Sequence, residues 1–100
     1  ASALAQSDAK LEFEAFCEDV DNLSRTVMQA RQAGVSMKNS VTTVEGIMRS
    51  VDAEYRDHLR DVMIAAYGEP LEESEQAKQR AVNEFTNRMY RECLLKASDR

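Results

Sequence analysis

The sequence predicts an all-α fold: an antiparallel four-helix bundle with two longer outer helices, the first and the last, and two shorter inner helices, clamped by one disulfide. Good helix formers are abundant, and only three Gly and one Pro interrupt the 100 residues. A β-sandwich or barrel would need many more turns. Apolar residues recur at three- and four-residue spacing in four stretches, and the two cysteines lie near opposite ends of the chain.

Residues 1–7 are expected to form a signal-peptide remnant or a disordered leader, and residues 8–97 a single helical domain. Ala3 and Ala5 have the small-residue spacing of a signal-peptidase site, which predicts cleavage after Ala5 and a mature start at Gln6. Together with a cysteine pair, this pattern predicts a periplasmic or secreted protein.

The first helix is predicted to begin at Asp8 and to end before Gly34, a residue type that favours the position just past a helix. Its apolar stripe is Phe13, Phe16, Cys17, Val20, Leu23, Val27 and Ala30. The opposite face is acidic and is the candidate partner surface, because it can dock a basic protein and speed the encounter. Its members are Glu12, Glu14, Glu18, Asp19 and Asp21.

Two shorter helices are predicted in the middle of the chain. Ser36 is a good N-cap for the first of them, whose apolar positions are Met37, Val41, Val44 and Met48. Ser50 or Asp52 can cap the next, and Gly68 with Pro70 beyond it stops that helix. Its apolar face consists of Tyr55, Leu59, Val62, Met63, Ala66 and Tyr67.

The last helix is predicted to start after the N-cap Ser74 and to end before Ser98. In an antiparallel bundle the start of the first helix lies beside the end of the fourth, which brings Cys17 and Cys93 together. Both cysteines also fall on the apolar stripes of their helices. A disulfide closing so long a loop stabilises by about 4 kcal/mol in the chain-entropy model.

The charge and hydropathy of the chain argue against several classes of function. The net charge is −5, without a basic stripe to neutralise phosphates, so nucleic-acid binding is not expected. No apolar run approaches the length of a membrane span. Nucleophile elbows, phosphate-binding glycine loops and Cys-x-x-Cys motifs are absent from the sequence, and neither an enzymatic activity nor a cofactor is expected.

The single histidine offers the alternative of a metal-binding or enzymatic helical protein. On a helix, Glu54, His58 and Asp61 share a face and resemble half of a metal site. Di-iron bundles place a Glu-x-x-His element on each of two helices, and here the spacing differs and a second histidine is missing. A solvated charged face is the favoured interpretation.

Three segments form a recognisable pattern: Ala30-Arg31-Gln32-Ala33-Gly34-Val35-Ser36-Met37, then Ala66-Tyr67-Gly68-Glu69-Pro70, then Phe85 and Cys93. Over residues 15–95 the chain resembles small uncharacterised exported proteins of bacteria and their phages. That resemblance implies a helical fold with a cysteine pair and no particular activity. A looser likeness, in size, compartment and disulfide alone, is to the helical periplasmic immunity proteins that neutralise type VI secretion effectors.

The function predicted from these observations is an exported, non-catalytic protein-binding domain, with an inhibitor or immunity protein as its first version. A periplasmic stress chaperone is the alternative, in which acid loosens the bundle and exposes Met- and Ala-rich faces. Of the five methionines, Met37, Met48, Met63 and Met89 fall on predicted core faces and are expected mainly as flexible core filler, with a pliable surface that binds partners as the alternative. A homodimer is a further expectation, because four short helices bury limited area.

Overall fold

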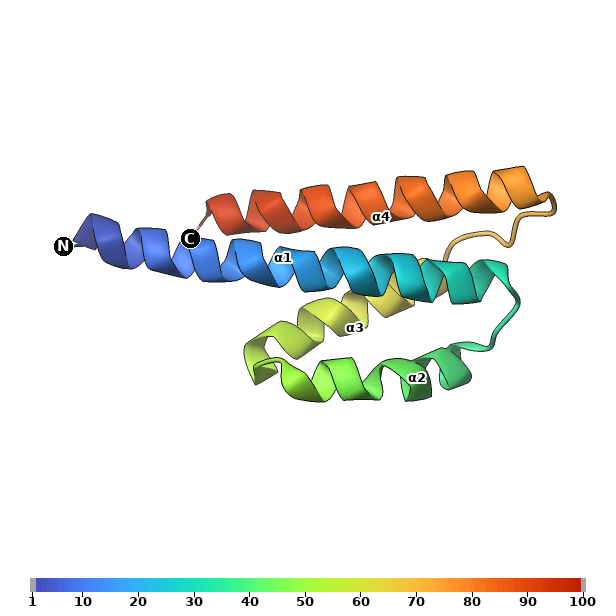
Figure 1. Cartoon of the computed structure of the whole chain (residues 1–100), viewed down its shortest axis with the longest axis horizontal. Helices are drawn as coiled ribbons and strands as arrows, with labels where there is room; N and C mark the ends of the chain where they lie inside the picture. The colour runs from blue at the N-terminus through green and yellow to red at the C-terminus, as the bar shows by residue number, and fades with distance from the viewer. Residues whose placement is uncertain (1, 100) are drawn as a thin grey trace.

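Four α-helices make up the computed structural model, which describes the backbone of residues 2–99 and the side chains of residues 8–99. They are α1 (Ser2–Gln32), α2 (Met37–Ser50), α3 (Ala53–Tyr67) and α4 (Glu75–Ser98). Successive helices run in opposite directions (Figure 1). The predicted all-α, antiparallel four-helix bundle is therefore confirmed.

The capping residues lie where the sequence predicted them. The Ser36 hydroxyl accepts a hydrogen bond from the Asn39 amide at 3.2 Å, and the Ser74 hydroxyl accepts one from the Ala77 amide at 3.1 Å. Gly34 has a φ of 83°, the left-handed conformation that glycine adopts without strain. Local polar and glycine chemistry thus fixes three of the helix ends.

Helix α1 begins earlier than the apolar pattern predicted, at Ser2 instead of Asp8. The preceding residues include three alanines, the strongest helix formers, and no residue among them stops a helix. The predicted cleavage after Ala5 concerns residues 1–7, whose side chains lie outside the described part of the chain. At the other end, α4 continues through Ser98, slightly beyond the predicted stop.

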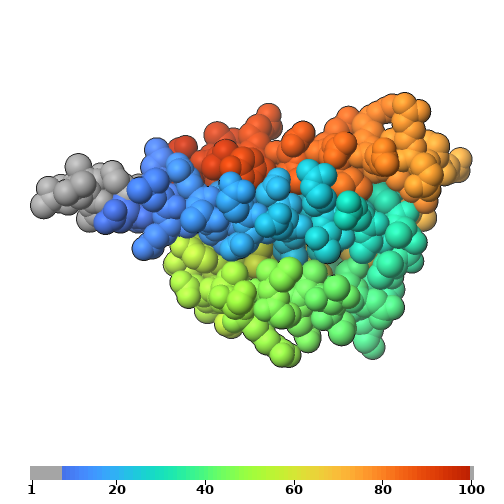
Figure 2. Space-filling model, viewed as in Figure 1, coloured from blue at the N-terminus to red at the C-terminus, as the bar shows by residue number. Residues whose placement is uncertain are grey.

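Helix α1 is the central element. It packs most extensively on α4, next on α3, and only a little on α2. The space-filling view shows α2 on one side of α1 and α4 on the other (Figure 2). The first and last helices are the longer ones, as predicted, but they are direct neighbours, while α2 and α3 form a shorter hairpin on α1.

The hydrophobic core lies where α1 packs against α3 and α4. On α1 the buried stripe matches the predicted one closely, and it also contains Met28, which the pattern did not assign to the core. Helix α2 contributes little, since Ser40 and Val44 are its buried residues. The main buried side chains from the other helices are Leu59, Val62, Met63, Ala66, Val82, Phe85, Cys93 and Ala97.

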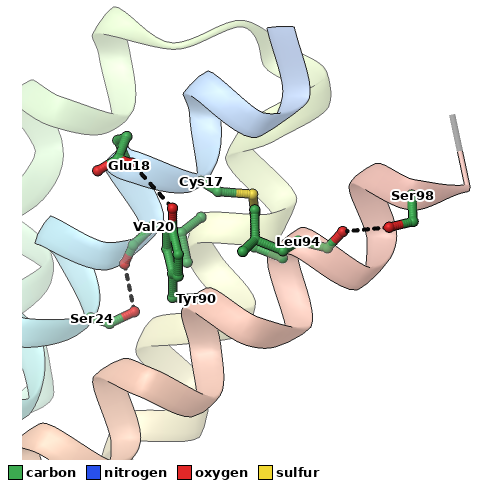
Figure 3. Close-up of a disulfide and its surroundings, with 8 residues drawn as sticks. Cys17, Glu18, Val20, Ser24, Tyr90, Leu94 and Ser98 are labelled. Atoms are coloured by element: carbon green, nitrogen blue, oxygen red, sulfur yellow. Dashed lines mark hydrogen bonds between the residues drawn. A yellow bond between two sulfur atoms is a disulfide. The ribbon is translucent and has the colours of Figure 1, made fainter. Parts of the chain in front are cut away.

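A disulfide joins α1 to α4 near the N-terminal half of α1 (Figure 3). The sulfur atoms of Cys17 and Cys93 are bonded at 2.08 Å, with 5.7 Å between the two Cα atoms. Both cysteines are buried. The predicted pairing is confirmed, and its reason is the antiparallel register of the two longest helices.

Side chains at the C-terminal ends of α1 and α3 bond the loops on either side of the hairpin. The side-chain amide of Gln32 donates to the Pro70 carbonyl oxygen at 2.9 Å, and its oxygen accepts from the Glu72 amide at 2.9 Å. The Tyr67 hydroxyl donates to the Val35 carbonyl oxygen at 2.8 Å. These bonds fix where the hairpin leaves and rejoins the α1–α4 pair.

Removal of the disulfide should strongly destabilise the protein. The two bonded cysteines are 76 positions apart in the sequence. For a loop of this length the chain-entropy model gives a stabilisation of about 4 kcal/mol. We expect the double variant Cys17→Ala/Cys93→Ala to lose about this amount in urea unfolding monitored by circular dichroism. Wild-type protein kept reduced is the control, because it lacks the bond but keeps both sulfur atoms. Equal unfolding free energies in all three samples would contradict the prediction.

A second stability prediction concerns Thr86, which is fully buried on α4. Its hydroxyl oxygen has no hydrogen-bond partner among the residues that the structure describes. A buried unpaired hydroxyl costs about 1–3 kcal/mol, so Thr86→Val should stabilise the protein by about 1 kcal/mol. The matched control is Ser24→Ala, because the buried Ser24 hydroxyl does donate, to the Val20 carbonyl oxygen at 2.6 Å. Urea unfolding that shows Thr86→Val to be the more destabilising change would refute the assignment.

Candidate functional site

The acidic surface on α1 consists of two separate rows. Glu14, Glu18 and Asp21 follow one another at helical spacing along the margin of α1 that faces α4, where the Tyr90 hydroxyl donates to a Glu18 oxygen at 3.2 Å (Figure 3). Glu12 and Asp19, seven residues apart, form the other row and are exposed. The five acids thus all lie outside the core, as predicted, but they do not form a single patch.

Tyr90 responds electrostatically to the first row of acids. The hydrogen bond to Glu18 raises the pKa of the Tyr90 hydroxyl, and the negative charges of Glu18, Asp21 and Glu14 add to that effect. The cause is that an ionised tyrosine would lose its donor proton and place a second negative charge beside a carboxylate. This interaction links Glu18 of the first row to α4.

The histidine lies in an aromatic cluster and does not assemble a metal half-site. The ring of His58 packs edge-on to Phe13 and Phe16, with centroid distances of 5.6 and 6.0 Å. Asp61 lines a narrow cleft beside it, while Glu54 is exposed. Over residues 8–99, no group of three His, Cys, Asp or Glu side chains is arranged to hold a metal ion. His58 and Asp61 line the same cleft but Glu54 does not, so the predicted face of Glu54, His58 and Asp61 forms no three-residue metal site among the described side chains.

An open groove lies between α2 and α3, with a volume of about 330 Å³. Its apolar lining consists of Met37, Val41, Met48 and Met63, and its charged lining of Glu45, Arg49, Arg56 and Arg60. We call it the methionine groove. Met63 is buried and forms part of the wall, whereas Met37 is 37% exposed. The groove is lined by these two helices alone, so α1 and α4 leave it open to a partner.

The helix that forms one wall of this groove is the least anchored in the protein. Two side-chain hydrogen bonds link α2 to α3: the hydroxyl of Ser40 is hydrogen bonded to that of Tyr67 at 2.5 Å, and Arg56 donates to the Met48 carbonyl oxygen at 3.1 Å. Val44 is the one apolar residue that α2 buries fully. Gly46 and several β-branched residues also weaken α2 as a helix. The groove can therefore adjust its width with little loss of core packing.

Another hollow lies between α1 and α4, with a volume of about 430 Å³. Its lining is mainly polar, and these polar groups already pair with each other. Arg25 donates to the Asn83 side-chain oxygen at 3.1 Å, and Lys78 lies 4.0 Å from Glu75. This hollow lacks the apolar floor of a typical binding site, which the methionine groove has.

Sequence reasoning missed the methionine groove because it assigned Met37 and Met48 to the core. Their helical spacing is correct, but a short helix that barely contacts α1 keeps much of its apolar face outside. The signal that could have revealed the groove is the spacing of Arg56, Arg60 and Met63, which share one face of α3. Arginines on the same face as an apolar residue indicate a surface at the edge of the core.

The fold and the groove define a disulfide-linked, all-α domain. Comparisons with models of protein families, with curated proteins and with solved structures found no match. In the part of the chain that the structure describes, no helix has the length and apolar character of a membrane span.

The acidic row of α1 that contains Glu18 faces Tyr90 of α4. The ionisation of Tyr90 therefore tests how this row is placed. We expect the pKa of Tyr90 to lie above the usual value of about 10 and to fall in Glu18→Gln, since that change removes the negative charge. The interaction of Tyr90 with Glu18 stabilises the folded protein fully below about pH 10, the pKa of tyrosine in the unfolded chain. Because the folded-state pKa is raised, this contribution is lost as the pH rises through that higher value. The measurement is a pH titration in which NMR follows the chemical shift of the Tyr90 ring carbon that carries the hydroxyl.

The matched control for this titration is Glu12→Gln. Glu12 belongs to the other acidic row and does not contribute to the raised pKa of Tyr90. An equal fall of the pKa in both variants would show that the two rows do not act separately.

Proposed function

We propose that this chain is an exported, non-catalytic protein-binding domain that works in the periplasm or outside the cell. The disulfide supports the compartment, because such bonds persist in oxidising environments. The observation that carries the binding function is the methionine groove, an open surface with an apolar floor between the two helices of the hairpin.

Burial of the groove by a partner would provide substantial binding free energy. Fully burying a Met or Val side chain yields about 1.5–3 kcal/mol, and Met37, Val41 and Met48 are all partly or largely accessible. Methionine is also unbranched and polarisable, so it adapts its shape to a partner. These properties suit a protein surface better than a small substrate that needs fixed polar groups.

Within this class we propose an inhibitor or immunity protein that binds one partner, rather than a stress chaperone with many clients. The groove is already formed in the folded chain, and α3, one of its walls, packs on the disulfide-linked α1. A preformed surface loses less conformational entropy on binding. The likeness to helical periplasmic immunity proteins agrees with this version by analogy alone.

The alternative of a stress chaperone rests on the weak anchoring of α2. Release of this helix would expose Val44 and the inward face of α3 to unfolded clients. The two versions differ in stoichiometry, since an inhibitor forms a saturable one-to-one complex and a chaperone does not.

A charge placed in the groove should abolish partner binding. We expect Met37→Glu/Met48→Glu to lower the affinity for the partner by about tenfold or more, because both changes replace apolar side chains of the groove with carboxylates, which are costly to desolvate. The measurement is capture from an envelope extract of the native host, quantified by mass spectrometry and followed by titration of the captured protein. The control is Leu95→Glu, which alters an exposed apolar residue on α4.

Circular dichroism and melting curves should show that both variants are folded. Capture of one protein by the wild type and by Leu95→Glu, but not by the groove variant, is the expected result. Equal capture by all three proteins would contradict the proposed function. A broad set of clients, with binding that increases as α2 is destabilised, would favour the chaperone.

A further inference from the structure

We infer that the methionine groove binds an acidic amphipathic helix of a partner protein, with apolar side chains on the methionines and carboxylates on Arg49, Arg56 and Arg60. This inference rests on the proposed protein-binding function and adds the chemistry of the partner.

The residues that line the groove carry a positive net charge, opposite in sign to the net charge of the whole chain. Three arginines and one glutamate line it, whereas the whole chain carries a net charge of −5. Arginine presents a planar fork of donors that matches a carboxylate in a bidentate fashion. A local excess of arginine around an apolar floor is complementary to a surface that combines apolar and acidic groups.

These arginines can exchange their present partners for those of another protein. The side chains of Arg49 and Arg60 are 79% and 66% exposed, and their pairs with Glu45 and Asp57 measure 3.4 and 3.8 Å. Exposed pairs of this kind contribute little, so a carboxylate delivered by a partner can displace them. Arg56 bonds the Met48 carbonyl oxygen through Nε, and its guanidinium has further donors.

The groove has the shape that a helix requires. Its lining residues on α2 run from Met37 to Met48 at intervals of three and four residues, and Arg49 follows directly, which corresponds to a length of about 18 Å along the helix axis. On α3 the lining runs antiparallel to α2, from Arg56 to Met63. The α3 wall is shorter, about 10 Å, so the two walls face each other over about two turns and accept an amphipathic helix of about that length.

A second copy of this chain fits the groove less well. The acidic first half of α1 has the required charge, but its apolar stripe is already buried against α3 and α4. Among the described residues of α1, Leu11 is the one large apolar side chain that is exposed, at 60%. One leucine does not provide the row of apolar contacts that the methionines offer.

The test uses two synthetic helical peptides with the same leucine stripe, one flanked by glutamates and the other by lysines. Each is titrated into the full-length, oxidised, isotope-labelled protein, and binding is followed by NMR. We expect the acidic peptide to bind at least about tenfold more tightly, with methyl shifts at Met37 and Met48 and an affinity that falls with salt.

Charge reversal supplies the matched variants. Arg49→Glu/Arg60→Glu should remove the preference for the acidic peptide, whereas Arg80→Glu/Arg91→Glu makes the same charge change at exposed positions of α4 and should leave it unchanged. Unfolding midpoints equal to that of the wild type would show that the variants are intact.

Three results would overturn the inference. Equal, salt-insensitive binding of both peptides in the groove would refute the acidic partner and leave the proposed function standing. Absence of methyl shifts with either peptide would refute a helix in the groove, while the capture experiment with Met37→Glu/Met48→Glu still decides the proposed function. Dimers of the wild-type chain that Arg49→Glu/Arg60→Glu dissociates would make a second copy the occupant.

Discussion

The bond between Cys17 and Cys93 fixes the register of α1 against α4, and the remaining helices take their positions from α1. In the same register, Arg25 reaches Asn83 and Tyr90 reaches Glu18. Because Gln32 of α1 also bonds the loop between α3 and α4, and Tyr67 of α3 bonds the loop between α1 and α2, the position of the hairpin is further restricted. A chain of 100 residues buries limited apolar area and so gains limited stability from its core. A covalent bond that restricts the unfolded state adds to that stability.

Packing weakens with distance from this α1–α4 pair. Helix α3 still buries a full apolar face on α1, whereas α2 buries two residues and depends on polar contacts to Tyr67 and Arg56. Local opening should therefore begin at α2. The methionine groove lies beside α2, the helix that buries the fewest apolar side chains in the core. A surface that must change its contacts on binding is more easily formed there than on the tightly packed α1–α4 pair.

Local signals made much of the fold predictable. Gly34, Ser36 and Ser74 each act within one helical turn, so their roles follow from the sequence alone, and the pairing of Cys17 with Cys93 follows from helix order. The exposure of Met37 and the burial of Met28 were not predictable in the same way. Helical periodicity indicates which residues share a face, but only tertiary packing decides whether that face meets another helix or solvent. The aromatic surroundings of His58 and the groove itself depend on contacts between helices for the same reason.

The distribution of charge connects the groove to the acidic rows of α1. In the proposed complex, an acidic helix is attracted by Arg49, Arg56 and Arg60 and repelled by the rows that contain Glu18 and Asp19. Attraction at one surface and repulsion at another favour a single docking orientation, and both act at long range during the encounter. The acidic rows then contribute to specificity without contacting the partner, because they disfavour the wrong surface. A basic partner would experience the reverse, being drawn to α1 and excluded from the methionines. The sign of the partner's charge therefore determines which face of this protein is used.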